Sequence, residues 1–310
     1  MFSVVFPGQG SQFVGMTKEL YSDFNYVKEL FQQADDALGF SLSKIILEGP
    51  KEKLDETENT QPSIFLASQS IYQIIKKETK VDLSKANFFA GHSLGEYSAL
   101  AASESLNFDQ TIKLLKKRGK AMQSAVPKGE GGMLAVLGID IEKLNKILEE
   151  NVSNYKCFIA NDNSNGQIVL SGKNKDIERL ILDLKKDSIK NIKLPVSAPF
   201  HCELMRTATE VMRKEIEITE FKKPNNSIVS NVTSIETRDP LQIKELLIKQ
   251  IESPVRWRES IIYMANKGVR KFIEIGPGKV LSGLIKRIDK NLSITNVNGI
   301  NDIKNLNIND

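Results

Sequence analysis

The sequence predicts an α/β protein, with a parallel-sheet core in a large domain and a small α+β subdomain inserted into it. Three observations lead to this fold class. Toward both ends of the chain, short apolar runs alternate with longer segments of helical periodicity, the pattern of a parallel sheet covered by helices. In the middle, two strand-helix-strand units follow each other directly. Hydrophobic residues make up 40% of the 310 residues, which is enough for a full core.

The N-terminal part is expected to alternate between strand and helix. Its first apolar run stops at Pro7-Gly8. A later helix opens at Pro62, and proline suits a first helical turn because its missing N–H costs no hydrogen bond there. In the last helix of this part, Ile112 and Leu115 recur at helical spacing. The expected strands are 2–6 and 88–90, and the expected helices are 23–38, 62–77, 94–102 and 109–124.

The sequence changes character after Pro127. Strand, helix, strand, strand, helix and strand follow in that order from Gly131 to about Ser197, which is the order of a ferredoxin-like domain. We therefore expect an inserted ferredoxin-like subdomain over 128–197 and a large domain over 1–127 and 198–310. The expected pieces of the subdomain are 133–137, 141–151, 158–161, 167–171, 175–186 and 192–195.

Alternation of strand and helix resumes after the insertion and continues the large domain. The expected elements are a strand at 228–230, helices at 241–251 and 260–266, a strand at 271–275 and a helix from 279. The last dozen residues are rich in Asn and Asp, and we expect them to form a loose tail.

Charge, cysteine content and hydropathy exclude several classes of protein. A net charge of +4 is far from the strongly basic composition of a nucleic-acid binder. The two cysteines, Cys157 and Cys202, form neither a disulfide framework nor a paired metal-ligand spacing. The N-terminus lacks the charged region of a signal peptide, and no apolar run approaches the roughly 20 residues that cross a bilayer. We expect a cytoplasmic monomer that binds neither nucleic acid nor a membrane.

The segment Gly91-His92-Ser93-Leu94-Gly95 matches G-x-S-x-G between an expected strand and an expected helix, which is the context that this pattern requires. The sharp turn exposes the serine, and the flanking glycines let the backbone approach closely without a Cβ clash. The helix that follows points its N–H groups at a developing oxyanion. The pattern predicts Ser93 as a nucleophile in an α/β-hydrolase-like large domain, although Gly-rich strand-helix turns also arise by chance.

The chain has only two histidines that could act as general base, His92 and His201. A serine nucleophile needs a group that can hold its proton near neutral pH, and histidine is the usual one. His92 is adjacent to Ser93 on a tight turn, so the two side chains diverge. His201 is therefore the expected base. Cys202 beside it is expected to be a small buried residue rather than part of a thiol dyad.

Two glycine-containing turns raise the question of a nucleotide cofactor. Gly276-Pro277-Gly278-Lys279 lacks the spacing of a phosphate-binding loop, and Pro277 removes an N–H that such a loop uses. Gly8-Gln9-Gly10 has no third glycine in the dinucleotide-binding register. We expect no cofactor and no metal ion.

Several short segments, in one order and spacing, carry a resemblance to a known family. They are Phe6–Gln12, Gly91–Glu96, Arg118–Gln123, Gln167–Gly172, His201, Gln250 with Pro254–Trp257, and Glu274–Leu281. Together they resemble the malonyl-CoA:acyl carrier protein transacylases of fatty-acid synthesis. The resemblance extends through essentially the whole chain. Each segment alone is modestly specific, and their joint presence makes the assignment.

The resemblance implies a two-step transfer. Ser93 would attack the thioester of malonyl-CoA, and His201 would pass the serine proton to the departing thiol. The pantetheine thiol of acyl carrier protein would then collect the malonyl group, in a ping-pong sequence. The backbone carbonyl of Gln250 would orient His201, in place of a carboxylate. The backbone N–H groups of Gln9 and Leu94 would form the oxyanion hole.

The resemblance also implies residues that bind the acyl group. Arg118 would grip the free carboxylate of the malonyl group, because a guanidinium binds a carboxylate through two parallel N–H donors. The alternative is that Arg118 is one more solvated cation in a lysine-rich helix. His92 and Asn161 would line the active-site region. Phe200 would crowd an α-methyl branch and so favour malonyl over methylmalonyl.

Two other functions fit part of the pattern. A serine esterase or thioesterase would use the same Ser93 and His201, but it has no use for a buried guanidinium at position 118. A catalytically silent scaffold would keep the fold alone. The joint presence of Gln9, Ser93, Arg118 and His201 argues against a scaffold. Arg118 discriminates between the esterase and the transferase.

Overall fold

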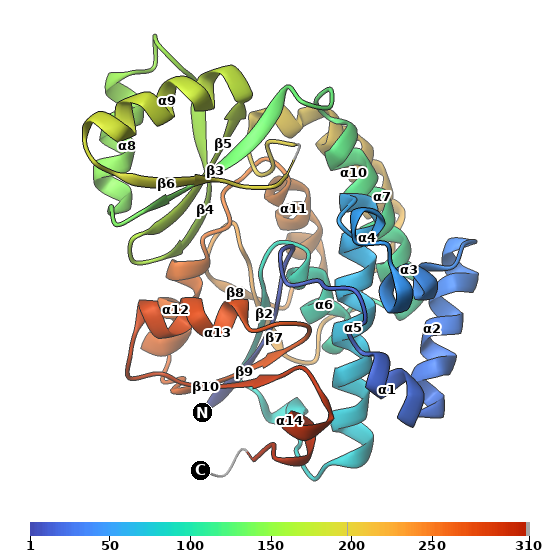
Figure 1. Ribbon diagram of the computed structural model, residues 1–310. Coiled ribbons are helices and arrows are strands. Elements are labelled where there is room, and N and C mark those ends of the chain that lie inside the picture. Colours follow the sequence, from blue (N-terminus) through green and yellow to red (C-terminus); the bar gives the residue numbers. More distant parts are fainter. Residues whose placement is uncertain (197, 308–310) are drawn as a thin grey trace.

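The computed structural model describes residues 1–196 and 198–307 and contains a six-stranded and a four-stranded sheet (Figure 1). The six strands follow the order β10-β9-β1-β2-β7-β8, and every neighbouring pair is parallel except β7 and β8. The prediction of a parallel-sheet core is confirmed. The strands are β1 (Phe2–Phe6), β2 (Phe88–Gly91), β7 (Ser227–Val229), β8 (Glu236–Thr237), β9 (Lys271–Ile275) and β10 (Ser293–Val297).

The central strands of this sheet are apolar on both faces because helices cover both. In β1, Val4 and Phe6 belong to the core on one face, and Val5 belongs to the core on the other. This is the period of two that a strand imposes on its side chains. The first face is covered by α5 (Thr57–Glu78), α6 (Gly95–Ala102) and α7 (Phe108–Ser124). The second is covered by α12 (Trp257–Asn266) and α13 (Val280–Ile288).

Further helices add to the core on the first face, and most of them lie on the side of the molecule where α2 and α7 stand in Figure 1, whereas α11 lies near the centre and α14 at the bottom. None of the described helices combines the length and apolar character needed to cross a bilayer. These further helices are α1 (Lys18–Asp23), α2 (Asn25–Leu38), α3 (Leu42–Glu48), α4 (Lys51–Leu54), α10 (Arg206–Ile218), α11 (Pro240–Gln250) and α14 (Ile300–Lys304).

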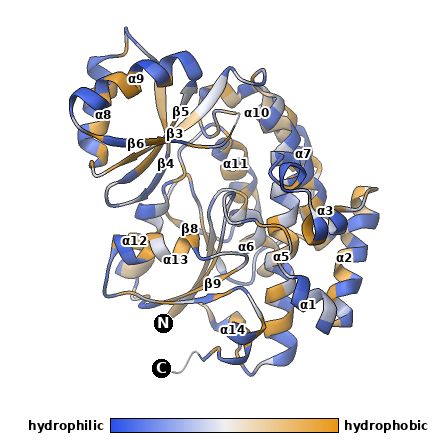
Figure 2. Cartoon of the chain, in the orientation of Figure 1, coloured by the Kyte–Doolittle hydropathy of each residue, from blue (hydrophilic) through white to orange (hydrophobic). Residues whose placement is uncertain are grey.

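The four-stranded sheet has the order β4-β5-β3-β6, and all of its pairs are antiparallel. The segments that connect its strands form the helices α8 and α9. Hydrophilic and hydrophobic colours alternate on both helices in Figure 2, as expected for helices with one buried face. Leu144 of α8 and Leu180 of α9 pack in a core of their own. The elements are β3 (Gly131–Leu137), α8 (Ile141–Glu150), β4 (Cys157–Ser164), β5 (Gln167–Lys173), α9 (Asn174–Lys186) and β6 (Lys190–Lys193).

The second face of this small sheet packs on the large part of the molecule. Met133, Ala135 and Val169 point to that side and join the main core. The backbone also connects the two parts, because the N–H of Val255 donates to the carbonyl of Ala160 at 2.8 Å and β4 bridges to the same residue. The small sheet is therefore tied through β4 to the segment that precedes α12.

Some elements differ from the sequence-based expectations. The helix expected from Pro62 begins five residues earlier, at Thr57, because its first turn is closed by hydrogen bonds to the Glu56 carbonyl that do not need the missing proline N–H. The helix expected over 23–38 is present as α2 from Asn25, and the short helix α1 that ends at Asp23 was not expected. The expected loose tail is wrong for residues 300–304, which form α14, whereas 308–310 lie outside the described residues. Helices α3, α4 and α10 and strands β8 and β10 were not expected.

Candidate active site

Ser93 occupies a sharp turn between β2 and α6. Its backbone φ is +54°, in the left-handed region that non-glycine residues seldom adopt. The turn is tight enough to exclude side chains on either side. A Cβ at Gly91 would lie 1.9 Å from the Gly95 carbonyl carbon, and a Cβ at Gly95 would lie 2.3 Å from the carbonyl oxygen of Phe6. The two glycines of the motif are therefore required by close backbone approach.

Asn231, which the sequence analysis did not single out, clamps this turn from the loop after β7. Its Oδ1 accepts the N–H of Ser93 at 2.8 Å, and its Nδ2 donates to the carbonyl of Gly91 at 2.8 Å. The side chain is fully buried. No local pattern marks Asn231, because its partners lie about 140 residues away in the sequence.

The Ser93 hydroxyl lies 2.8 Å from His201 Nε2. On the other side of the ring, Nδ1 lies 2.8 Å from the backbone carbonyl of Gln250. A carbonyl only accepts, so Nδ1 carries the proton and the neutral ring presents the Nε2 lone pair to the serine. His201 itself has a φ of +59°. The geometry is that of a serine nucleophile with an oriented general base.

Burial and the nearby Arg118 charge lower the pKa of His201 to about 3, and the hydrogen bond to the Gln250 carbonyl only partly opposes them. The imidazole is therefore neutral near pH 7 and ready to accept a proton. Burial likewise lowers the pKa of His92. His92 Nε2 is 2.8 Å from Asn163 Oδ1, and the ring packs 5.8 Å from that of Trp257. His92 is thus tied to its own partners and away from the base position.

Arg118 is 1% exposed, so it is no solvated surface cation. Its Nη1 donates to Gln61 Oε1 at 2.8 Å. Its Nη2 donates to Gln250 Oε1 at 2.8 Å and to Ser93 Oγ at 3.1 Å. The guanidinium also stands 5.6 Å from the centre of the Tyr97 ring. Within residues 1–196 and 198–307 it makes no ion pair with a carboxylate.

A cavity of about 110 Å³ brings these groups together between the two sheets. The large part of the molecule contributes Ser93 and Arg118, and the small sheet contributes Met133 and Asn161. The N–H groups of Gln9 and Leu94, both lining residues, find no acceptor in the part of the chain that the structure describes. The residues predicted from the sequence that line it are Gln9, His92, Ser93, Leu94, Arg118, Asn161, Phe200 and His201.

Gln250 lies just outside the lining, behind His201 and Arg118. Gln61 is a lining residue whose role as a partner of Arg118 the sequence did not indicate. Cys202 next to His201 is buried, donates to the Pro199 carbonyl and has its thiol pKa raised by burial to about 12, as a small buried residue does. In the described ranges, no three His, Cys, Asp or Glu residues lie close enough together to hold a metal ion.

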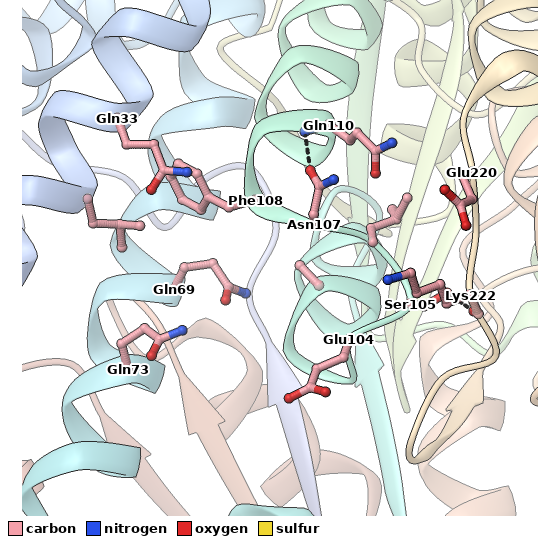
Figure 3. Close-up of a pocket in the computed structure, with 13 residues that line it drawn as sticks. Gln33, Gln69, Gln73, Glu104, Ser105, Asn107, Phe108, Gln110, Glu220 and Lys222 are labelled. Carbon is pink, nitrogen blue, oxygen red and sulfur yellow. Dashed lines mark hydrogen bonds between the residues drawn. The ribbon is translucent and has the colours of Figure 1, made fainter.

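A larger cavity, of about 450 Å³, lies elsewhere and shares no residue with the cavity around Ser93. Figure 3 shows Gln33, Gln69 and Gln73 on one side of it and Asn107 and Lys222 on the other. Its lining mixes amides, apolar side chains and a few charged groups, and among the described residues it has no nucleophile with an oriented base. The chemistry therefore belongs to the smaller cavity.

Comparison with known proteins identifies the family of this chain. The model of the acyl transferase domain family matches residues 3–304. The malonyl CoA-acyl carrier protein transacylase of Haemophilus influenzae is 41% identical over 300 residues, which cover 96% of either chain. The protein of the same name from Bacillus subtilis is 43% identical over 290 residues, covering 93% of this chain and 90% of that one. The chain belongs to the malonyl CoA-acyl carrier protein transacylase family.

Solved structures of transacylases extend this agreement to the fold. An acyl-carrier-protein-S-malonyltransferase from Bartonella henselae superimposes with a TM-score of 0.94 at 40% identity, covering 98% of this chain and 97% of that one. A malonyl-transacylase in complex with its type II PKS acyl-carrier protein gives a TM-score of 0.93 at 38% identity, with 98% and 97% covered. The family resemblance that the motifs indicated is confirmed.

Proposed function

We propose that the chain transfers the malonyl group from malonyl-CoA to the phosphopantetheine thiol of acyl carrier protein through a malonyl ester of Ser93, and so supplies the extender unit for fatty-acid biosynthesis. One observation carries the proposal. The Ser93 hydroxyl oxygen is 2.8 Å from a neutral His201 and 3.1 Å from a buried arginine that has no carboxylate partner in the described residues. The names of the relatives support the same substrate and acceptor.

In the first half-reaction, Ser93 Oγ attacks the thioester carbonyl carbon as its proton moves to His201 Nε2. The carbonyl oxygen becomes an oxyanion, and the N–H groups of Gln9 and Leu94 are the donors that we assign to it. When the carbon–sulfur bond breaks, His201 returns the proton to the coenzyme A sulfur. Removing one such oxyanion donor typically costs about 3–4 kcal/mol of barrier.

The second half-reaction runs the same steps in the opposite direction. The pantetheine thiol of the carrier protein gives its proton to His201 and attacks the ester carbonyl. The bond between the carbonyl carbon and Ser93 Oγ then breaks, and Ser93 recovers the proton. No carboxylate is needed behind His201, because its Nδ1–H donates to the Gln250 carbonyl, with 2.8 Å between Nδ1 and the oxygen.

Arg118 gives the site its preference for a malonyl group in this proposal. Of its five N–H donors, three are used by Gln61, Gln250 and Ser93, and two are left for a carboxylate. An esterase for neutral acyl groups gains nothing from a desolvated guanidinium, whose burial is costly. Phe200, which is 7% exposed and lines the cavity, would exclude an α-methyl branch. Equal loading of malonyl and methylmalonyl thioesters would contradict that role.

The decisive experiment is intact mass spectrometry after mixing with malonyl-CoA. A malonyl adduct that is absent in Ser93→Ala would support the nucleophile and the substrate together, and transfer of that adduct to holo acyl carrier protein would support the acceptor. Free malonate in place of an adduct would favour a hydrolase. No reaction at all would favour a scaffold.

The finer description of the fold is part of the proposal. The order β4-β5-β3-β6 and the separate core around Leu144 support a ferredoxin-like subdomain over 128–197, inserted between 1–127 and 198–310. The turn of Ser93 between a parallel strand and a helix supports the α/β-hydrolase-like description of the large domain. The cytoplasmic location, the monomeric state, and the absence of a cofactor, of nucleic acid and of membrane binding stay predictions from the sequence.

A further inference from the structure

The side chain of Gln250 lies between two buried ionisable groups. Its Oε1 accepts from Arg118 Nη2 at 2.8 Å, and its Nε2 donates to Glu96 Oε2 at 2.9 Å. All three side chains are at most 2% exposed. The contact between Gln250 and His201 uses the backbone carbonyl instead. A substitution at position 250 therefore changes the contact with Arg118 and keeps the group that orients His201.

Glu96 is the buried carboxyl group nearest to this amide. Burial raises its pKa to about 7, and the hydrogen bonds from the Asn231 N–H and from Gln250 oppose that shift only in part. Its Oε2 also accepts the backbone N–H of Asn231 at 3.0 Å. Opposite charges attract strongly where water is excluded, and an arginine side chain is long and flexible. Even so, Arg118 makes no ion pair with Glu96 or with any other carboxylate in 1–196 and 198–307. The amide of Gln250 stands in the place where such a pair would form.

Hydrogen-bond chemistry fixes the orientation of this amide. A guanidinium only donates and a carboxylate only accepts, so the amide oxygen must face Arg118 and the amide nitrogen must face Glu96. Nε2 also donates to the carbonyl of Ser93 at 3.1 Å, which further holds it on that side. Each of the two groups is hydrogen-bonded, and the amide stands between them in place of a direct contact.

We propose that the side chain of Gln250 is a positioning residue that acts as a neutral spacer, keeping Glu96 away from Arg118 and leaving Arg118 free to bind the carboxylate of the acyl group. The inference rests on the proposed malonyl transfer. A direct pair with Glu96 would use N–H donors of Arg118 that its hydrogen bonds to Gln61, Gln250 and Ser93 leave free. The site would then acylate Ser93 without recognising a carboxylate.

The sharpest test is Gln250→Glu, which keeps the size of the side chain and places a carboxylate directly against Arg118. We measure Ser93 acylation by rapid-quench intact mass over a range of malonyl-CoA and acetyl-CoA concentrations. Both share coenzyme A, so only the acyl carboxylate differs. We expect the ratio of malonyl to acetyl acylation, each as kcat/KM, to fall at least about tenfold, the value of one lost charged hydrogen bond. Loss of the donor to the Ser93 carbonyl affects both acyl groups alike and cancels in this ratio.

A second pair of variants separates a spacer from a simple support. In Gln250→Ala the guanidinium can reach Glu96, so malonyl loading should again weaken. Adding Glu96→Gln to Gln250→Ala removes the competing charge, and we expect the double variant to recover malonyl loading at least severalfold. If Gln250 merely supported Arg118 mechanically, adding Glu96→Gln would not restore malonyl loading.

Glu274→Gln is the matched control. Glu274 is a second fully buried carboxylate, bound to the first turn of α13 and in no contact with Arg118. Its loss should leave the ratio of malonyl to acetyl loading unchanged. Equal losses for both acyl groups in Gln250→Glu, or a double variant that loads malonyl no better than Gln250→Ala, would overturn the spacer. If Gln250→Ala does not fold, Gln250→Glu decides alone. A wild-type protein that loads no malonyl would overturn the proposed function itself.

Discussion

Two strand-turn-helix units stand on either side of β1 in the same parallel sheet, and only one of them carries a nucleophile. After β2, the turn holds Ser93, and the N–H of Leu94 at the start of α6 finds no acceptor in the described chain. After β9, the turn leads into α13, whose first N–H groups are taken by the Glu274 carboxylate, at 3.0 Å from Leu281 N and 2.8 Å from Ser282 N.

The difference shows what makes such a turn catalytic. Both units present a glycine-containing turn and a helix N-terminus, which together favour a negative charge. In the second unit the protein's own carboxylate satisfies that preference, so nothing is left for a ligand. In the first, no side-chain carboxylate takes the N–H of Leu94, which has no acceptor in the described chain, and the distant His201 and Arg118 converge on the same oxygen. This free N–H and the convergent partners therefore separate the site from its neighbour.

The largest expected effect is the loss of the nucleophile. In Ser93→Ala the rate of acylation by malonyl-CoA should fall by at least about 10⁴-fold, because Ser93 is the only hydroxyl residue among the described residues that line the cavity. Intact mass after incubation with malonyl-CoA measures the adduct. Ser282→Ala, at the start of α13, is the matched serine and should keep its adduct. An adduct that persists in Ser93→Ala would break the comparison.

Arg118 should have the next largest effect. In Arg118→Ala the kcat/KM for malonyl-CoA should fall by about 100-fold, since one or two charge-assisted hydrogen bonds are worth about 1.5–3 kcal/mol each. Loading from acetyl-CoA should fall much less. Lys117→Ala removes the neighbouring cation, which is half exposed and paired with Glu215, and should leave both rates unchanged. A parallel loss for the two thioesters would assign Arg118 to the fold instead of the carboxylate.

Glu274 should matter for stability and not for chemistry. In Glu274→Ala the free energy of unfolding should drop by about 1–3 kcal/mol, because the N–H groups of Leu281 and Ser282 lose a buried acceptor. Chemical denaturation measures this change. Acylation per folded molecule should be unaltered. A selective loss of malonyl loading in this variant would show that the second turn also takes part in the site.

The smallest expected effect is that of lowering the pH from 8 to 5 on the rate of acylation through His201. The pKa of His201 is lowered to about 3, so the ring is neutral in the folded protein throughout pH 8 to 5. Acylation by p-nitrophenyl acetate, a neutral ester that does not need Arg118, should therefore stay nearly constant over this range. A rate that titrates near pH 6.5 would contradict a buried neutral base.

Unlike the acylation rate, the free energy of unfolding should depend on pH through His201. Below about pH 6.5 the unfolded chain protonates His201 and the folded chain does not, until the pH approaches 3. The contribution of His201 to stability is thus present above pH 6.5 and is lost as the pH falls from there toward 3. Comparing wild type with His201→Ala in denaturant unfolding at pH 7.5 and 5 measures this contribution to the free energy of unfolding.

The sequence by itself determined those features that depend on neighbouring residues. The glycines around Ser93 predict the turn, the apolar runs predict the strands of the parallel sheet, and the presence of only two histidines points to His201. Local pattern also explains the misses. The first turn of α5 forms without Pro62, and α14 is short enough for its residues to read as a polar tail.

Only the tertiary structure decided which partners surround these residues. Asn231 and Gln61 carry no local signature, because a side-chain amide becomes a clamp only when the fold brings its partners within hydrogen-bond distance. The burial of Arg118 was likewise decided by the tertiary structure. Its helix is rich in lysine and reads as a solvated face, yet the packing of α7 against α5 buries this one cation beside Ser93. Burial is a property of the whole fold, and the carboxylate site that we propose at Arg118 depends on that burial.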